Sequence, residues 1–434
     1  MDHRSSSTKL CKYVAHEDFI SNLPDGLKDK ILCCLPIKEA VATCLLSRNW
    51  RYTWTSMTEL MFRADDFTSE NGNANDDKSR FLKFTDMFLS LHDGPILKFG
   101  LNTKDVQIYT GGHIYRWMLI LSRKRIKELQ LRTTMRDCYK IPSSFFSCHE
   151  LESVYLRFCR LTTSQLPLLS KGFKQLHTLH LECCYILGGN NFGDLVASCP
   201  NLNKLILNRI YSLADINIHS TKLKMLTLDG HFKHLNLHTP CLTSAVIKLR
   251  PLPSDASKIR CNFNFSQFIA SLSDVESISY LGPILERAEH ELLVLKLPKS
   301  FNRLKRISLD LDLGNLKEAN LALYLFQHAP YLQFINLQLT SNEPIVPAVH
   351  FWESIDRHVC LFQNVRAVGM INFTGSGAEL GFLKLILEDA PVLKRAFIND
   401  NGKLGKDDLK NLLKLRRASK DAEIVIFSGS VPPV

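Results

Sequence analysis

The sequence predicts an α/β fold in which three N-terminal helices precede a solenoid of stacked strand units. The solenoid is expected to have a parallel sheet on its concave side, helices on its convex side and a C-terminal region that caps it. Three observations lead to this prediction. The N-terminus contains an apolar helical segment, the pattern L-x-x-L-x-L recurs through most of the 434 residues, and several repeats follow a helical segment that ends at proline.

The stretch from Asp18 to Trp54 contains the three predicted helices. Leu23-Pro24 stiffens its start, because proline fixes φ and cannot continue a preceding helix. The expected helices are Leu27–Leu35, which Pro36 ends, Lys38–Leu46, and a third that Ser47 caps and that contains Trp50 and Trp54. Helices this short carry more apolar residues than they can bury alone, since domains below about 40 residues rarely sustain a core. We therefore expect a docking surface for helices of another protein.

This stretch resembles the F-box motif in an unbroken register. The matching positions are Leu23-Pro24-Asp25, Ile31-Leu32, Leu35-Pro36, Ala40-Val41, Leu45-Leu46-Ser47-Arg48, Trp50-Arg51 and Trp54. The resemblance implies binding to a Skp-type adaptor and, through it, to a cullin-based (SCF) ubiquitin ligase. The residues expected to contact the adaptor are Leu23, Pro24, Ile31, Leu35, Pro36, Val41, Leu45, Trp50 and Trp54. The alternative is a small helical subdomain that packs on the rest of the chain. The F-box is expected over residues 15–60.

Residues 61–125 are expected to form a polar loop and a helical lead-in to the repeats. The segment Arg63–Arg80 is rich in Asn and Asp, which favours a surface loop. A helix is then expected from Phe81, followed by a turn at Asp93-Gly94-Pro95, a strand, and a second helix over Ile114–Ser122.

The repeats are expected over residues 126–355. Their first copies are Ile126-Leu129-Leu131, Leu151-Val154-Leu156, Leu176-Leu179-Leu181, Leu202-Leu205-Leu207, Leu223-Leu226-Leu228 and Leu242-Ala245-Ile247, and weaker copies follow. Leu151–Leu161 and Leu176–Ile186 match the full leucine-rich pattern, which assigns Cys159 and Cys184 to the core. The helical segments before the strands end at Cys199-Pro200, Ala329-Pro330 and Ala390-Pro391. Stacked units of this kind form a curved leucine-rich-repeat solenoid.

Strand alternation buries the leucines and turns the residues between them outwards, onto the concave sheet. The outward residues are polar, mixed in charge and include aromatics, and Tyr and Arg are favoured at protein interfaces. The residues expected to contact a target protein are Arg132, Tyr155, Arg157, His180, Glu182, Asn208 and Asp229. The alternative is that they are only solvated side chains of an exposed face.

The C-terminal residues 356–428 resemble the FBD region found at the end of many plant F-box proteins. The matching stretches are Gly375–Leu380, Phe382–Leu393, Arg416–Ser419 and Ile424–Phe427. The segments Leu91–Pro95 and Arg116–Ser122 also fit that group. The whole chain therefore resembles the plant F-box/FBD/leucine-rich-repeat protein family, and the FBD region is expected to continue and cap the solenoid.

Composition narrows the possible compartments and ligands. No apolar run approaches the roughly 20 residues that span a bilayer, and the polar residues 1–12 do not resemble a secretory signal. Thirteen cysteines without a Cys-x-x-Cys pair indicate reduced thiols, so a cytoplasmic or nuclear protein is expected. We expect no cofactor and no metal, because the spacing of His231, His234, His238 and Cys241 fits no ordinary zinc pattern.

The net charge of +11 leaves nucleic-acid binding open, with basic clusters at Arg123–Lys127 and Lys403–Lys420. Interleaved acidic residues and missing aromatics disfavour it. No catalytic motif is present, so the chain is expected to be non-catalytic. Three functions follow: the substrate-recognition subunit of an SCF ubiquitin ligase, a non-degradative scaffold that binds the adaptor, and a basic solenoid that binds nucleic acid.

Overall fold

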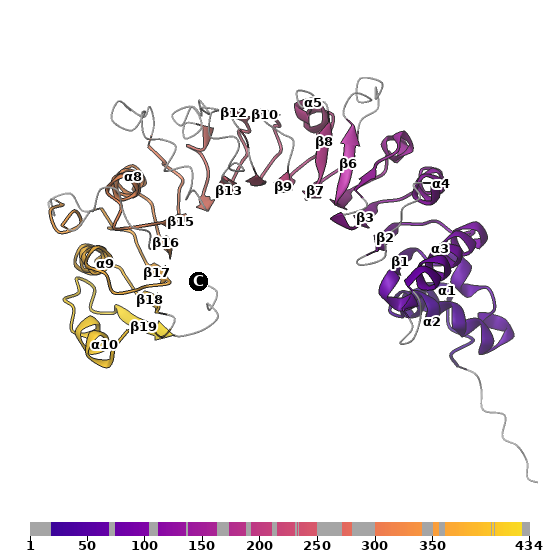
Figure 1. The fold of residues 1–434 in the computed structure, drawn as a ribbon, viewed down its shortest axis with the longest axis horizontal. Coiled ribbons are helices and arrows are strands. Elements are labelled where there is room, and N and C mark those ends of the chain that lie inside the picture. Colours follow the sequence, from indigo (N-terminus) through magenta and orange to yellow (C-terminus); the bar gives the residue numbers. More distant parts are fainter. Residues whose placement is uncertain are drawn as a thin grey trace, which may run out of the picture.

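The computed structural model describes residues 19–68, 74–103, 112–135, 138–162, 173–187, 192–210, 215–230, 232, 234–249, 271–279, 300–340, 350–355, 361–400, 402 and 404–427. The molecule is an arc with a strand layer on its inner side and helices on its outer side (Figure 1). The predicted α/β solenoid with a parallel sheet is confirmed. Among the described residues, no helix combines the length and the apolar character needed to cross a membrane.

One parallel sheet runs through the arc in strict chain order. Its strands are β1 (Glu59–Arg63), β2 (Lys98–Asn102), β3 (Glu128–Arg132), β5 (Ser153–Arg157), β7 (Thr178–Glu182), β9 (Lys204–Ile210), β11 (Met225–Gly230), β13 (Ser244–Leu249), β14 (Ser277–Ser279), β15 (Arg306–Leu311), β16 (Phe334–Leu339), β17 (Ala367–Ile371), β18 (Arg395–Asn399) and β19 (Glu423–Phe427). Most strands alternate buried and accessible residues, as β5 does with its buried Val154 and Leu156, whereas β2, β17 and β19 depart from this alternation. In the alternating strands the apolar residues therefore point to the helices, and their polar neighbours point to the concave side.

The outer side of the arc carries the helices and two smaller parallel sheets (Figure 1). The helices that follow the F-box are α3 (Ala74–Leu91), α4 (Gly112–Leu121), α5 (Phe192–Ala197), α8 (Leu316–Gln327), α9 (Gly377–Asp389) and α10 (Lys406–Leu413). The smaller sheets contain β4 (Tyr139–Lys140), β6 (Cys159–Thr162) and β8 (Tyr185–Leu187), and β10 (Asp215–His219) and β12 (His234–His238). Cys159 and Cys184 are fully buried there, as the leucine-rich pattern predicts.

The N-terminal module has two short α-helices, α1 (Asp25–Cys33) and α2 (Ile37–Ala42), followed by three 3₁₀ turns (Thr43–Leu45, Arg48–Trp50 and Thr53–Ser56). The continuous third helix expected through Trp50 and Trp54 is wrong. Tyr52 leaves the helical region at φ −119° and ψ 3°, and the Thr53 and Thr55 hydroxyls donate to nearby backbone carbonyls. Such side-chain bonds compete with the α-helical ladder. Ser47 does precede the 3₁₀ turn, but its hydroxyl shares a hydrogen bond of 3.1 Å with that of Ser21 instead of capping it.

The lead-in differs from the sequence prediction in two ways. The sheet begins upstream of residue 126, since β1 and β2 pair with each other and β2 pairs with β3. The loop expected over Arg63–Arg80 is wrong at its end, because α3 already begins at Ala74. The polar residues Asp76 and Asp77 occupy the first turn of this helix, where carboxylates favour the helix dipole. The polar end of this segment is therefore the first turn of an amphipathic helix, in which Asp77 itself is buried.

The C-terminal region continues the same sheet. Strands β17, β18 and β19 add to it in parallel, each in a register without slips. Helix α9 begins at a capping box in which Ser376 accepts a hydrogen bond from the backbone of Glu379, and the Glu379 side chain bonds back to the cap. The C-terminal region that resembles FBD thus continues the solenoid through β19.

Candidate adaptor-binding face and concave site

The N-terminal module leaves large apolar side chains exposed. Leu45 is 85% exposed, and Leu46 and Tyr52 are each 70% exposed. Leu27 and Ile31, which are one turn apart on α1, also remain accessible. Exposed apolar side chains gathered in one short module mark an interaction site, because water would otherwise favour their burial.

The nine residues expected to contact an adaptor fall into three groups. Pro24, Ile31, Pro36 and Leu45 are exposed, and Leu23, Leu35 and Val41 are half-buried. Trp50 and Trp54 are only 3% and 8% exposed, so their expected place on the contact surface is wrong. Both rings belong to the chain's own core.

Several exposed residues were missed by the sequence prediction: Phe19, Ile20, Leu27, Leu46 and Tyr52. The spacing of Leu27 and Ile31 by four residues was a usable signal, because it places both on one face of α1. Tyr52 gave no such signal, since its exposure depends on the break between the two 3₁₀ turns.

The module is joined to the solenoid through contacts that start at Trp54. Its ring lies 4.9 Å from that of Phe88 on α3. His92, just past α3, bonds through Nε2 to the carbonyl of Met57 at 2.8 Å. The backbone amides of Asp93 and Gly94 donate to Thr55 at 3.0 and 3.3 Å. We call this contact between residues 54–57 and 92–94, together with Phe88, the joint.

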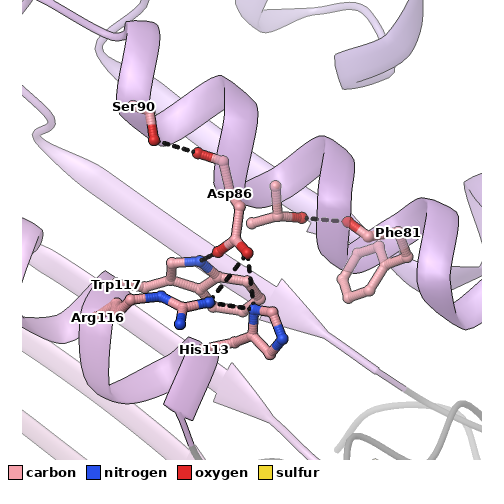
Figure 2. Close-up of polar contacts among 7 residues, drawn as sticks. Phe81, Asp86, Ser90, His113, Arg116 and Trp117 are labelled. Carbon is pink, nitrogen blue, oxygen red and sulfur yellow. Dashed lines mark hydrogen bonds and ion pairs between the residues drawn. The ribbon is translucent and has the colours of Figure 1, made fainter.

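The Asp86 carboxylate then connects α3 to α4, the next helix on the outer side of the arc. Asp86 of α3 accepts hydrogen bonds from the Trp117 indole at 2.7 Å and from Arg116 at 3.1 Å, and Nδ1 of His113 lies 2.8 Å away (Figure 2). Trp117 is 1% exposed, so its N–H depends on this acceptor. The joint and this carboxylate clamp connect the N-terminal module to the repeat region through packed, hydrogen-bonded contacts.

The concave sheet brings all seven expected target residues together on five adjacent strands. Arg132, Arg157, Glu182 and Asn208 form one row across β3, β5, β7 and β9, and Tyr155 pairs with His180 in the neighbouring row. Asp229 lies one strand beyond Asn208, on β11. We call Arg132, Tyr155, Arg157, His180, Glu182 and Asn208 the concave cluster.

Tyr155 is the centre of the concave cluster. Its hydroxyl donates to Glu182 at 2.5 Å, the guanidinium of Arg132 lies 4.9 Å from its ring, and the His180 ring meets it edge-on at 4.5 Å. Burial, together with the bond to Glu182, raises the pKa of Tyr155 to about 12, so the phenol keeps its proton. Burial also lowers the pKa of His180, which leaves this imidazole neutral near pH 7.

The first basic cluster is occupied by internal contacts. Lys124 donates to the carbonyls of His92, Asp93 and Gly94 at 3.3, 3.2 and 3.0 Å. Arg125 and Lys127 pair with Glu150 and Glu152 at 3.1 and 2.8 Å. These cations are engaged at the joint and beside the sheet, so fewer of them are available to bind nucleic acid. The second cluster is only partly described: residue 403 and the side chains of residues 406–409 lie outside the described part.

The described residues contain no group of three or more His, Cys, Asp or Glu side chains that could hold a metal ion. Of the four residues weighed as zinc ligands, His231 and the side chain of His234 lie outside that description.

Comparisons with known proteins agree with this architecture. A family model described as "FBD-associated F-box protein At5g56370, LRR repeats" matches residues 114–333, and the F-box domain model matches residues 20–60. The Arabidopsis thaliana F-box/FBD/LRR-repeat protein At1g13570 is 28% identical over 431 residues, covering 94% of this chain and 98% of the relative. The F-box/FBD/LRR-repeat protein At3g52680 of the same plant is 27% identical, covering 96% and 93%. Neither matching family model describes an enzyme. The chain therefore belongs to the plant F-box/FBD/leucine-rich-repeat protein family.

Proposed function

We propose that this protein is the substrate-recognition subunit of an SCF-type ubiquitin ligase. Its F-box would bind a Skp-type adaptor, and its repeat surface would hold a target protein for ubiquitination and degradation. The observation that carries the proposal is the exposed apolar set on the F-box, with Leu45 at 85% exposure in a module whose own core is already complete. Apolar side chains left outside a buried core fit a site for a protein partner.

The protein itself contributes position and no chemical step. The joint and the Asp86 clamp hold the F-box at a fixed place relative to the concave sheet. A target held on that sheet would stay near the ubiquitin-conjugating enzyme of the complex, which raises the effective concentration of its lysines. A stiff connection keeps this distance constant.

The first experiment is co-purification of the full chain with a Skp-type adaptor. Deleting residues 1–60 is a poor control, because β1 starts at Glu59 and its loss would expose the edge of β2. A double substitution of the exposed leucines, Leu45→Asp with Leu46→Asp, removes the apolar surface and spares the fold. Adaptor capture by the wild type and its loss in this variant are expected; equal capture by both would contradict the proposal.

The same preparations separate the alternatives. Ubiquitination of a captured partner by the reconstituted complex distinguishes a ligase subunit from a scaffold that only binds the adaptor. A solenoid that binds nucleic acid would instead retain RNA or DNA with a steep dependence on salt and without need of the adaptor.

A further inference from the structure

We propose that the concave cluster binds a carboxylate side chain, Asp or Glu, in a segment of the target protein, with Arg132 and Arg157 as its ligands. This inference deepens the proposed function by naming the chemistry of the target, and it rests on that function only in calling the bound segment part of a ligase target.

Two arginines lie side by side on the concave face of the sheet. Arg132 and Arg157 are register partners on β3 and β5, so their side chains leave the sheet on one face about 5 Å apart at the backbone. Like charges directly opposite on neighbouring strands are unfavourable. A bound anion between them would remove this cost and accept hydrogen bonds from both guanidinium groups.

The carboxylate of the concave cluster, Glu182, is already engaged by its neighbours. Glu182 accepts the Tyr155 hydroxyl through Oε2 and lies 3.5 Å from Nε of Arg157 through Oε1. That Nε is inaccessible from outside, so a ligand would use the terminal nitrogens of Arg157, whose side chain is 42% exposed. Arg132 is exposed, and among the described residues its guanidinium forms no ion pair and lies over the Tyr155 ring. The pair of arginines thus keeps donors for a ligand.

The charges around the arginine pair favour a carboxylate over a phosphate. Two guanidinium groups face Glu182 within the cluster and Asp229, the register partner of Asn208, while His180 is neutral. A monoanionic carboxylate adds less negative charge beside Glu182 and Asp229 than a dianionic phosphate does. The Tyr155 and His180 rings provide an apolar platform for the carbon atoms next to that carboxylate.

The experiment is a selection with the full chain, alone and bound to its adaptor, from a display library of random linear peptides. We expect the enriched peptides to share one Asp or Glu at a fixed position. A synthetic copy with the corresponding amide should bind about tenfold more weakly, since a charge-assisted hydrogen bond is lost. Because the free chain is tested too, a failure of adaptor binding does not affect this result.

Two variants locate the binding site. Arg132→Ala should weaken the acidic peptide about tenfold and abolish the difference between the acid and its amide copy. Arg306→Ala is the matched control, because Arg306 is also an exposed strand residue whose guanidinium lies over a neighbouring ring, that of Phe334 at 5.6 Å. It should leave both affinities unchanged. An equal loss in both variants would overturn the proposal.

A third variant tests the charge argument by a gain. Glu182→Gln removes the competing carboxylate and should strengthen the acidic peptide several-fold, whereas a purely structural role for Glu182 predicts no gain. Unchanged or weaker binding would contradict the assignment. The proposal would also be overturned if no peptides were enriched, or if the enriched peptides were basic or uncharged. It would likewise be overturned if the chain bound single-stranded RNA instead of acidic peptides and Arg132→Ala weakened that binding.

Discussion

The exposed Leu45 and the buried Trp54 allow a sharp test of which F-box residues face the adaptor. Both match the F-box motif, yet Leu45 is 85% exposed and Trp54 is 8% exposed. The structure therefore assigns them opposite roles. Leu45→Ala should act on adaptor binding and leave folding intact, whereas Trp54→Ala should act on folding first.

The expected magnitudes follow from burial. Removing an exposed leucine side chain changes the free energy of unfolding by at most about 0.5 kcal/mol. If Leu45 is an anchor, its truncation costs about 2 kcal/mol of binding, or about thirtyfold in Kd. Removing a buried tryptophan costs about 3–5 kcal/mol of stability, because it leaves a cavity against Phe88.

The assay combines adaptor titration with amide hydrogen exchange of the full chain. Trp54→Ala should increase exchange in β1 and α3, which pack together through Phe62 and Phe88 beside Trp54, and Leu45→Ala should not. Adaptor binding by Leu45→Ala at the wild-type level would refute a contact role for Leu45. Loss of binding in Trp54→Ala, with exchange in β1 and α3 at the wild-type level, would refute a structural role for Trp54.

Three further predictions concern the joint and the clamp. Gly94→Ala should destabilise the chain by about 1–3 kcal/mol in urea unfolding, because its Cβ would lie 2.8 Å from Cα of Ser56; Gly26→Ala, with no atom within 4 Å, is the neutral or stabilising control. Asp86→Ala should cost about 1–3 kcal/mol by leaving the buried Trp117 N–H without an acceptor, seen as faster exchange in α4, and unchanged exchange would contradict the clamp. Burial lowers the pKa of His92, so the unfolded chain takes up this proton first; stability should fall as pH drops from about 6.5 to the lowered folded pKa, and His92→Gln should flatten that part of the profile. A stability profile that is the same in both proteins would exclude His92 as its source.

The candidate sites were predictable to different extents. The alternation of apolar residues placed Arg132, Tyr155 and Glu182 on one face correctly, because side chains on a strand switch sides at every residue. Their contacts were not predictable, since the 2.5 Å bond between Tyr155 and Glu182 depends on the register of two strands that lie 27 residues apart. In the F-box, the motif identified the matching positions but did not show which of these side chains are buried and which are exposed.

The sequence by itself determined the repeat, the direction of each strand face and the resemblance to F-box and FBD regions, because these depend on local spacing. Only the tertiary structure decided that Trp50 and Trp54 turn inward, that β1 already belongs to the sheet, and that His92 and Gly94 hold the F-box in place. The physical reason is that an amphipathic segment specifies which side is apolar, whereas the surface that covers this side is supplied by residues distant in the chain.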